Sequence, residues 1–523
     1  MDDPLSPAGP ADRGSVRTPS SDSGKSVRGR SPAADGGDDE SLESFLHSTG
    51  FLRGDFSDVT VVAFDHNYHL HRLVLARSPF FASMFSDRWA PDGAGPLAVD
   101  FAADANITRT SLEIALADMY GQRDPAAVAQ HALAVVATAS FLGLASLGRA
   151  AQAAAVAAVS ADTVADMVQF AAACDYGAAS SALLEAARAL LLADGWQLTA
   201  TAWAEFPVEF AAEIVAADGF YVPDEWARCL FVVELVDMYL GVEADVAPLR
   251  DVLARDIHYM HLSFERIQQL DEMRTADGAP VVDPAVLQRA VWDALVLRHR
   301  TLTSTAGDPH LGLLTPDPPG GRYPVPNVDE TMVAVPPAPA RRSYAKYPPF
   351  RFSHEFTDVD RLNGSDRLYS RTIWYAGSYW NVYVQRVRPR KNMPQLGLYL
   401  HRAKPPRAPD VRPPDDDDPD SDPDKTMLVT ARAVSGGDSR RPEPSVGEWV
   451  DPRLATATYF YITMPSARKQ SGGTRDCSFA SSPDMFSVSQ SWGWKSTLIC
   501  DAFEDGPPGA GKTLKLSIVL GNV

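Results

Sequence analysis

A segment of the sequence has the spacing of a phosphate-binding loop. It reads Gly506-Pro-Pro-Gly-Ala-Gly-Lys-Thr513, which matches GxxxxGK[ST]. In such a loop the backbone N–H groups and the Lys hold nucleotide phosphates, but only where a buried strand leads in and a helix follows. Here the acidic stretch 501–505 precedes the loop and the alternating stretch 514–520 follows it. We therefore expect a hairpin loop between two strands, and no nucleotide or other cofactor.

Two groups of histidines have the residue type for metal binding. His66, His69 and His71 form one group, and His258 and His261 form the other. Neither group has a Cys or carboxylate at the spacing of a structural metal site, so we expect no metal. For His71 we expect a satisfied core residue that caps the following helix. No Ser/His/Asp, Cys/His or paired-carboxylate arrangement stands out, and the sequence predicts a protein that is not an enzyme.

The composition favours a folded protein with several domains. The chain has 523 residues, of which 45% are hydrophobic and 22% charged, so a large part of it can bury a core. The formal net charge of −19 disfavours a protein that coats nucleic acid, because phosphate binding needs a basic surface. The basic stretch 386–391 is expected to be a solvated loop between strands.

Cysteine usage and hydropathy indicate a compartment. Cys174, Cys229, Cys477 and Cys500 form no CxxC pair, which is typical of free thiols in a reducing environment. The first residues contain no apolar signal region. The uncharged stretch 132–148 is shorter than the roughly 20 apolar residues of a membrane span. We expect a cytoplasmic and/or nuclear protein without a membrane span.

Composition and periodicity divide the chain into five parts. Residues 1–47 are rich in Ser, Gly, Asp and Pro and are predicted to be a disordered tail. Residues 48–150 mix strand and helix patterns, and residues 151–302 have an Ala- and Leu-rich helical pattern. Residues 303–345 carry many Pro and Gly residues and are predicted to be a linker. Residues 346–523 alternate aromatic and polar side chains, which predicts a β-sandwich and an α+β multidomain chain.

Five short alternating stretches are the predicted strands of the last part, each with one buried face. They are 373–375, 380–384, 396–400, 458–463 and 514–520. A stretch near 403–447 is rich in Pro and contains Asp415-Asp-Asp-Asp418. Such a like-charged run predicts a disordered acidic insertion.

Four tryptophans in the last part are candidates for partner binding. They are Trp374, Trp380, Trp492 and Trp494. Large aromatic side chains dominate interfaces, but they dominate cores as well. The sequence leaves both roles open, and a core role is the more common one.

Three neighbouring stretches carry a resemblance to a known family. Phe56-Ser-Asp-Val-Thr-Val61 is followed by Tyr68-His-Leu-His-Arg72 and by Ser78-Pro-Phe-Phe-Ala-Ser-Met-Phe85. The strand opening and the fixed spacing of the aromatic residues resemble a BTB/POZ domain. Leu112, Leu116, Met119 and Tyr120 recur at helical spacing, which predicts one apolar helix face. This predicted helix, 112–121, is similar to the Leu–Tyr helix of that family, and the stretch 84–89 resembles its germ cell-less branch.

The later parts of the chain extend this resemblance. The helices of 151–302 resemble the BACK-like region of BTB proteins. Four stretches look like the MATH-like domain of germ cell-less relatives, namely Pro348–Phe352, Tyr375–Trp380, Leu396–Arg402 and Trp492–Trp494.

The resemblance implies specific interaction residues. BTB domains dimerise through an apolar face, and Asp58 and Arg72 would lie where the family buries a charged pair near the dimer seam. Many BTB proteins dock a cullin, for which Phe85, Trp89 and Tyr120 are the candidate contacts. The family often has a hydrophobic-x-Glu element just after the third helix. Here the equivalent segment reads Trp89-Ala-Pro-Asp92, which lacks the Glu, and its Pro removes a backbone donor.

Two functions follow from the resemblance. One is a homodimeric adaptor that recruits an unknown protein substrate to a cullin-based E3 ubiquitin ligase. The alternative is a dimeric BTB scaffold that tethers partners at chromatin or the nuclear envelope without ligase activity. The missing Glu favours the scaffold, whereas the long helical continuation of the BTB segment favours the adaptor.

Overall fold

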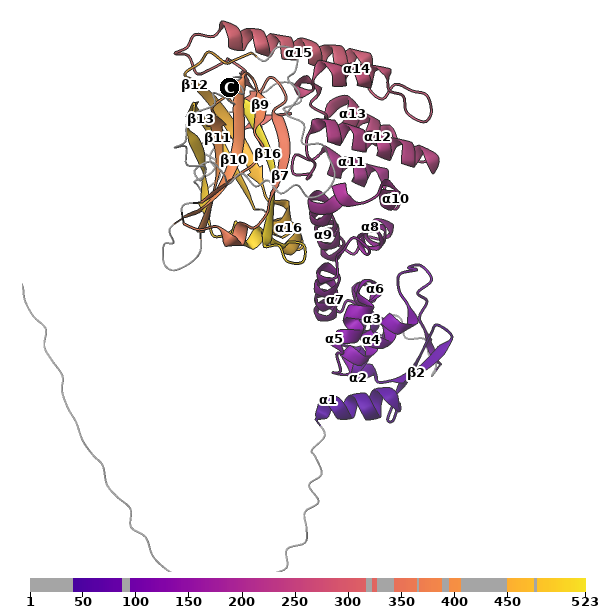
Figure 1. Ribbon diagram of the computed structural model, residues 1–523. Helices are drawn as coiled ribbons and strands as arrows, with labels where there is room; N and C mark the ends of the chain where they lie inside the picture. The colour runs from indigo at the N-terminus through magenta and orange to yellow at the C-terminus, as the bar shows by residue number, and fades with distance from the viewer. Residues whose placement is uncertain are drawn as a thin grey trace, which may run out of the picture.

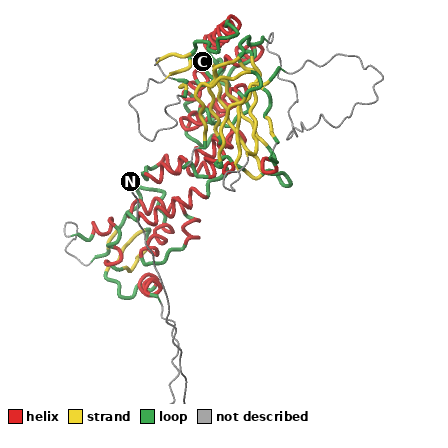
Figure 2. The backbone as a smooth tube through the Cα atoms, turned by 90° about the vertical axis from the view of Figure 1, so that its left-hand side faces the viewer, coloured by secondary structure: helices red, strands yellow, loops and turns green. Residues whose placement is uncertain are grey.

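The computed structural model describes eight stretches of the chain. They are residues 41–86, 95–316, 322–326, 343–364, 366–387, 395–405, 449–474 and 477–523. An N-terminal α/β unit lies at one end of the molecule, and a long series of helices leads from it to a β-sandwich at the other end (Figure 1). The view turned by 90° shows the same order, with the strands of the sandwich gathered away from the N-terminal unit (Figure 2).

The N-terminal unit contains a small three-stranded sheet. Strand β1 (Val59–Ala63) pairs antiparallel with β2 (His66–Leu70) and parallel with β3 (Leu97–Ala98). The β1–β2 turn places Phe64 and Asp65 at positive φ angles of 51° and 57°, as a tight hairpin requires. The small sheet thus begins with a tight hairpin in the region that resembles a BTB/POZ domain.

Helical structure begins earlier than the sequence predicted. Helix α1 (Leu42–Phe45) and the π-helix η1 (Leu46–Leu52) overlap the end of the expected tail. The Ser41 side chain caps α1 by accepting a hydrogen bond from the Ser44 backbone N–H at 3.2 Å. Leu46 packs against the buried core of the N-terminal unit, which explains why this polar segment is ordered. The rest of the expected tail lies outside the described residues.

Six helices cover the small sheet. Ser78 caps α3 and its hydroxyl donates to the Leu142 carbonyl at 2.5 Å, which ties α3 to the end of α6. Leu112, Leu116 and Met119 form one buried face of α4, as the sequence predicted. The six helices are α2 (Arg72–Leu75), α3 (Pro79–Met84), α4 (Arg109–Met119), α5 (Pro125–Gln130), α6 (Ala132–Leu142) and α7 (Ala145–Ala157).

The helical segment continues from the N-terminal unit without a break in the core. Met167, Phe170 and Leu183 belong to the same buried cluster as the N-terminal sheet and helices. Aspartates start two of these helices, Asp224 before α12 and Asp283 before Pro284 of α15. The helices are α8 (Val164–Ala173), α9 (Ala178–Asp194), α10 (Ala200–Trp203), α11 (Val208–Ala216), α12 (Glu225–Gly241), α13 (Ala247–Arg255), α14 (Phe264–Glu272) and α15 (Pro284–Thr303), with 3-10 turns η2 (Gly195–Gln197) and η3 (Tyr259–His261).

Two five-stranded sheets form the C-terminal sandwich, as the alternating stretches predicted. The first has the order β14-β11-β10-β8, with β9 also paired to β10, and the second β13-β12-β16-β15, with β7 also paired to β16. Side chains of both sheets meet in one buried core. The strands are β7 (Phe350–Phe356), β8 (Arg367–Tyr369), β9 (Ile373–Tyr375), β10 (Ser378–Val387), β11 (Gln395–Ala403), β12 (Ala455–Thr463), β13 (Ser478–Ser487), β14 (Ser491–Ser496), β15 (Glu504–Asp505) and β16 (Lys512–Asn522).

Strand β16 is buried on both faces, and the prediction of one buried face is wrong for it and for the stretch 380–384 of β10, where all residues are buried. Leu514 and Leu516 point into the sandwich core. On the opposite face, Lys515 Nζ lies 2.6 Å from Asp194 Oδ1 and the Ser517 hydroxyl donates to the Gly219 carbonyl at 3.4 Å. The helical segment therefore covers the outer face of this sheet.

The predicted linker contains ordered structure. Strands β4 (Leu314–Pro316), β5 (Pro324–Val325) and β6 (Ser343–Ala345) form a small sheet. Leu311 and Leu313 are buried in the sandwich core. A Pro- and Gly-rich stretch folds here because a few apolar side chains find partners far away in the chain. The acidic insertion expected near 403–447 lies outside the described residues from residue 406 onward.

Candidate protein-interaction surfaces

Asp58 and Arg72 meet, but not as a side-chain ion pair. The Asp58 carboxylate accepts a hydrogen bond from the backbone N–H of Arg72 at 2.7 Å. The Arg72 guanidinium instead lies over the Phe85 ring, 5.4 Å from its centre. Both residues are exposed in the single chain. The expected charged pair is thus replaced by a helix-start contact, since Arg72 is the first residue of α2.

Exposed apolar side chains flank this contact. Phe56 is 85% exposed and Leu73 is 87% exposed. Phe56 also has a positive φ of 64°, a conformation that costs free energy for a bulky residue. Phe56 and Leu73, close in sequence to Asp58 and Arg72, are therefore candidate apolar contacts for a protein partner.

Tyr120 is buried and cannot act as an exposed docking residue. It is 1% exposed, and burial raises the pKa of its hydroxyl to about 12. Its oxygen accepts the His71 backbone N–H at 2.9 Å and lies 2.9 Å from His71 Nδ1. His71 Nε2 lies 3.0 Å from the Asp55 carbonyl. His71 is therefore a satisfied residue, as expected, but its side chain makes no capping bond to α2.

Of the other two expected cullin contacts, Phe85 is described and follows the last residue of α3. Phe85 is half-buried, and its ring stacks on Phe81 with the ring centres 6.3 Å apart. Trp89 and the segment that contains the Pro91 departure lie outside the described residues. Among the described residues, Phe85 presents an aromatic ring at this end of α3.

The four tryptophan candidates divide between core and surface. Trp380 is fully buried against Phe486 and is a core residue, so it is unsuited to partner binding. Trp492 is 41% exposed on β14, and its Nε1 donates to the Met485 carbonyl at 2.9 Å. Trp494 is half-buried and stacks on another aromatic ring. Trp374 is half-buried and lines a groove.

That groove is an apolar recess of about 540 Å³ where the helical segment meets the sandwich. We call it the α15 groove. One wall is formed by α14 and α15, and the opposite wall by Trp374 of β9 and by Trp449, whose rings meet edge to face at 5.2 Å. Recesses of this size and character are typical of ligand sites in proteins. Sequence reasoning found Trp374 but not the groove, because its walls are far apart in the chain.

A buried ion-pair cluster joins the two sides of this interface. Arg351 of β7 donates to Glu225 of α12 through Nε at 2.5 Å and Nη2 at 3.0 Å. Burial alone raises the pKa of the Glu225 carboxyl, but the Arg351 guanidinium holds it well below its usual range. The His258 backbone N–H also donates to Glu225 at 3.0 Å. These contacts fix the sandwich against α12.

The histidines of this region serve the same interface. His258 Nδ1 lies 2.7 Å from the Pro349 carbonyl and His261 Nε2 lies 2.9 Å from the Pro348 carbonyl. Burial lowers the pKa of His261 to about 4. Both imidazoles thus hold the start of β7 as neutral hydrogen-bonding groups. Among the described residues, no group of three His, Cys, Asp or Glu side chains is arranged to hold a metal ion.

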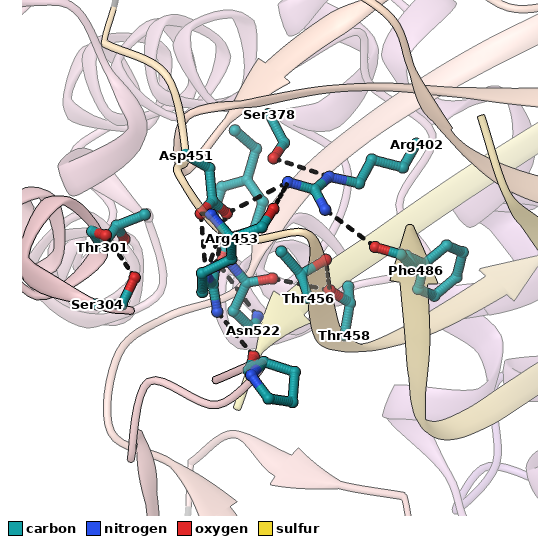
Figure 3. Close-up of polar contacts among 12 residues, drawn as sticks. Thr301, Ser304, Ser378, Arg402, Asp451, Arg453, Thr456, Thr458, Phe486 and Asn522 are labelled. Atoms are coloured by element: carbon teal, nitrogen blue, oxygen red, sulfur yellow. Dashed lines mark hydrogen bonds and ion pairs between the residues drawn. The ribbon is translucent and has the colours of Figure 1, made fainter. Parts of the chain in front are cut away.

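A second buried cluster ties the end of α15 to the sandwich (Figure 3). The side chains of Asp451 and Arg453 are 0% exposed and lie 2.7 Å apart. Arg453 also donates to the Pro309 carbonyl at 2.8 Å, and Arg402 donates to the Phe486 carbonyl at 3.0 Å. Since Pro309 follows α15 closely, this cluster helps to position the helical wall of the α15 groove.

The phosphate-loop spacing lies in the hairpin between β15 and β16, as expected. The backbone N–H groups of Gly511 and Lys512 donate to Asp358 and Asp360 at 2.9 and 2.6 Å. Lys512 Nζ lies 2.8 Å from Asp505. The groups that would hold phosphates are therefore occupied by carboxylates.

Comparison with known proteins defines the class of the N-terminal unit. The family model described as BTB/POZ domain matches residues 49–157. This span contains β1–β3 and α2–α7. The chain therefore carries a BTB/POZ domain.

Within that class the chain is similar to germ cell-less proteins over this region. Germ cell-less protein-like 1 of Homo sapiens is 29% identical over 106 residues, which is 20% of this chain and 20% of that protein. BTB/POZ domain-containing protein 2 of Schizosaccharomyces pombe is 34% identical over 107 residues, which is 20% of this chain and 37% of that protein. Protein germ cell-less of Drosophila melanogaster is 30% identical over 100 residues, 19% of this chain and 17% of that protein. The match spans about a fifth of the length of the germ cell-less relatives.

No helix in the described part of the chain is both long enough and apolar enough to cross a lipid bilayer.

Proposed function

We propose that this chain is a homodimeric, non-catalytic adaptor that brings a protein substrate to a cullin-based E3 ubiquitin ligase. In this proposal the BTB/POZ domain dimerises and docks the cullin. Helices α8–α15 act as a BACK-like connector, and the sandwich acts as a MATH-like substrate reader in the cytoplasm or nucleus.

The packed connection from the BTB/POZ domain through the helices to the sandwich supports this proposal. Residues of α8 and α9 share the BTB core, and buried or partly buried ion pairs join the helical segment to β7 and β16. An adaptor must hold its substrate at a set position relative to the ligase, because orientation governs transfer rates. A continuous packed connection supports such a role.

The exposed apolar surface around Phe56 and Leu73 supports dimerisation. Each side chain is more than four-fifths exposed in the single chain, at 85% and 87%. The Arg72 side chain and the Phe85 ring, 5.4 Å away, link this surface to the end of α3. In this arrangement dimer and cullin contacts occupy neighbouring regions of the BTB/POZ domain.

Calorimetry of the full-length chain with the N-terminal region of a cullin tests the proposal. We expect binding at about micromolar or tighter, and a loss of at least about tenfold in Phe85→Ala and in Trp89→Ala, because buried aromatic anchors dominate helix-groove contacts. Val488→Ala is the control, since Val488 is 46% exposed in the sandwich. Tyr120 is unsuitable as a test position because it is buried and bonded to His71.

A folded dimer that binds no cullin would instead favour the tethering scaffold without ligase activity. This outcome would agree with the sequence, because Trp89-Ala-Pro-Asp92 lacks the Glu that many cullin-binding BTB proteins have after the third helix. The sandwich would then be the bait in a search for tethered partners.

A further inference from the structure

The outer face of α15 carries a row of apolar side chains with one cation among them. Trp292, Leu295, Arg298 and Leu302 recur at spacings of three and four residues, so they lie along one face of the helix. Trp292 is 62%, Leu295 52% and Leu302 45% exposed. Leu295 and Arg298 also line the α15 groove. The row and the groove therefore form one apolar surface.

Arg298 has no partner in the described part of the chain. It is half-buried, and no ion pair or hydrogen bond joins it to another described residue. Its neighbours on α15 differ, since Arg289 Nε lies 2.9 Å from Asp293 and Arg300 donates to the Leu311 carbonyl at 3.1 Å. The Arg298 guanidinium is therefore available to pair with an anionic group of a bound partner.

The rest of the groove is apolar or neutral. Phe264, Trp374 and Trp449 supply aromatic walls, and Phe264 is 52% exposed. The imidazole of His261 is engaged with the Pro348 carbonyl at 2.9 Å and stays neutral near pH 7, because burial lowers its pKa to about 4. Arg298 therefore provides the positive charge of this surface.

The geometry points to the α15 groove as the docking site for a short linear segment of a protein partner that places a bulky apolar side chain beside an Asp or Glu. The apolar side chain enters between α14, α15 and the two tryptophans. The carboxylate accepts charge-assisted hydrogen bonds from Arg298. Trp292 and Leu302 lie on either side of Arg298 along α15, so apolar surface is available to the bound segment in both directions from the carboxylate. This inference rests on the proposed function, because it assigns the chemistry of the recruited substrate.

A random peptide library displayed on phage, panned against the full-length chain, tests the inference. Each displayed peptide carries flanking residues, so that a free C-terminal carboxylate is absent. We expect enrichment of peptides with a Trp, Phe, Leu or Met next to an Asp or Glu. The enriched peptides, synthesised and labelled, should bind about tenfold or more weakly to Arg298→Glu, because a charge-assisted hydrogen bond becomes a repulsion. Panning against Arg298→Glu itself should enrich Lys or Arg in place of the acidic residue.

Two control variants keep the test specific. Leu295→Asp should also lose the peptides, because it places a charge in the apolar wall. Lys495→Glu should keep them, because Lys495 is an exposed cation on β14, at the opposite edge of its sheet from β9. The thermal midpoint of each variant establishes that it is folded.

Three outcomes would overturn the inference. They are the absence of enriched peptides, the same enriched peptides on wild type and Arg298→Glu, and a change of oligomeric state in Leu295→Asp, which would mean that a second copy covers the groove. Cullin binding measured on the same variants separates the two proposals. Loss of peptides with intact cullin binding concerns the groove alone, whereas a wild-type chain that selects acidic-apolar peptides but binds no cullin contradicts only the ligase role.

Discussion

Replacing Arg351 with Met removes one partner of the buried ion pair that joins β7 to α12. Arg351 is 5% exposed and Glu225 is 4% exposed, and hydrogen bonds of 2.5 and 3.0 Å connect them. Breaking such a pair costs about 3–5 kcal/mol, because the remaining charge is left buried. Glu225 keeps the His258 backbone N–H at 3.0 Å and Arg228 at 3.8 Å. We therefore expect the lower end of the range, about 3 kcal/mol.

Urea unfolding of the full-length chain measures this cost, with Arg250→Met as the matched control. Arg250 and Asp277 form an exposed pair at 2.5 Å, with side chains 35% and 41% exposed. Exposed ion pairs contribute at most about 1 kcal/mol to the free energy of unfolding. A double-mutant cycle of Arg351→Met with Glu225→Gln should give a coupling of about 2 kcal/mol.

The pH dependence of this effect has a defined sign. The folded chain holds the pKa of Glu225 below its ordinary value of 4.5. A carboxyl of this kind contributes stability that is present above its ordinary pKa and is lost as the pH falls below it. The difference between wild type and Arg351→Met should therefore shrink below about pH 4.5. If Arg351→Met costs no more than Arg250→Met, or if the cycle shows no coupling, the ion pair does not hold the sandwich to the helices.

Four further predictions follow from the structure. Trp380→Ala should lower the free energy of unfolding in urea by about 3–5 kcal/mol. Trp492→Ala should lower it by less than about 1 kcal/mol, because only Trp380 of the two is fully buried. Equal costs would refute the division between core and surface. The pKa of His261 falls from 6.5 to about 4 in the folded chain. Between these two pKa values the unfolded chain binds more protons than the folded chain, so the free energy of unfolding should rise with pH. His261→Asn should flatten that slope in thermal melts, and an unchanged slope would contradict a buried neutral imidazole. Leu73→Asp should convert a dimer to a folded monomer in sedimentation, and a persistent dimer would exclude this surface. Magnesium ATP should leave the thermal midpoint unchanged, because carboxylates occupy the hairpin loop; a specific rise would overturn this assignment.

Local periodicity was enough to predict helix α4 and the strands β9, β10, β11, β12 and β16 of the sandwich. The stretches 373–375 and 458–463 correspond to β9 and to the end of β12, since alternation is a property of neighbouring residues. The apolar face of Leu112–Met119 was predicted for the same reason. The BTB/POZ resemblance came from residues that are close in sequence and whose spacing follows from the small sheet and its helices.

Contacts between distant parts of the chain were not predictable from local pattern. The double burial of β16 depends on helices more than 290 positions earlier, as the Ser517–Gly219 bond shows with a separation of 298 residues. Arg351 and Glu225 are 126 positions apart, and neither residue type signals a buried pair. Tyr120 was predicted as a cullin contact from family likeness, and local pattern did not reveal its hydrogen bonds to His71, which is 49 positions away. The α15 groove was missed because Arg298 and Trp374 belong to separate parts of the fold.

Sedimentation of the full-length chain mixed with the N-terminal region of a cullin is the most direct measurement of the central claim. The account predicts a complex of two chains and two cullins, lost in Trp89→Ala and Phe85→Ala while both variants stay dimeric. Separate sedimentation of a folded dimer and free cullin would contradict it.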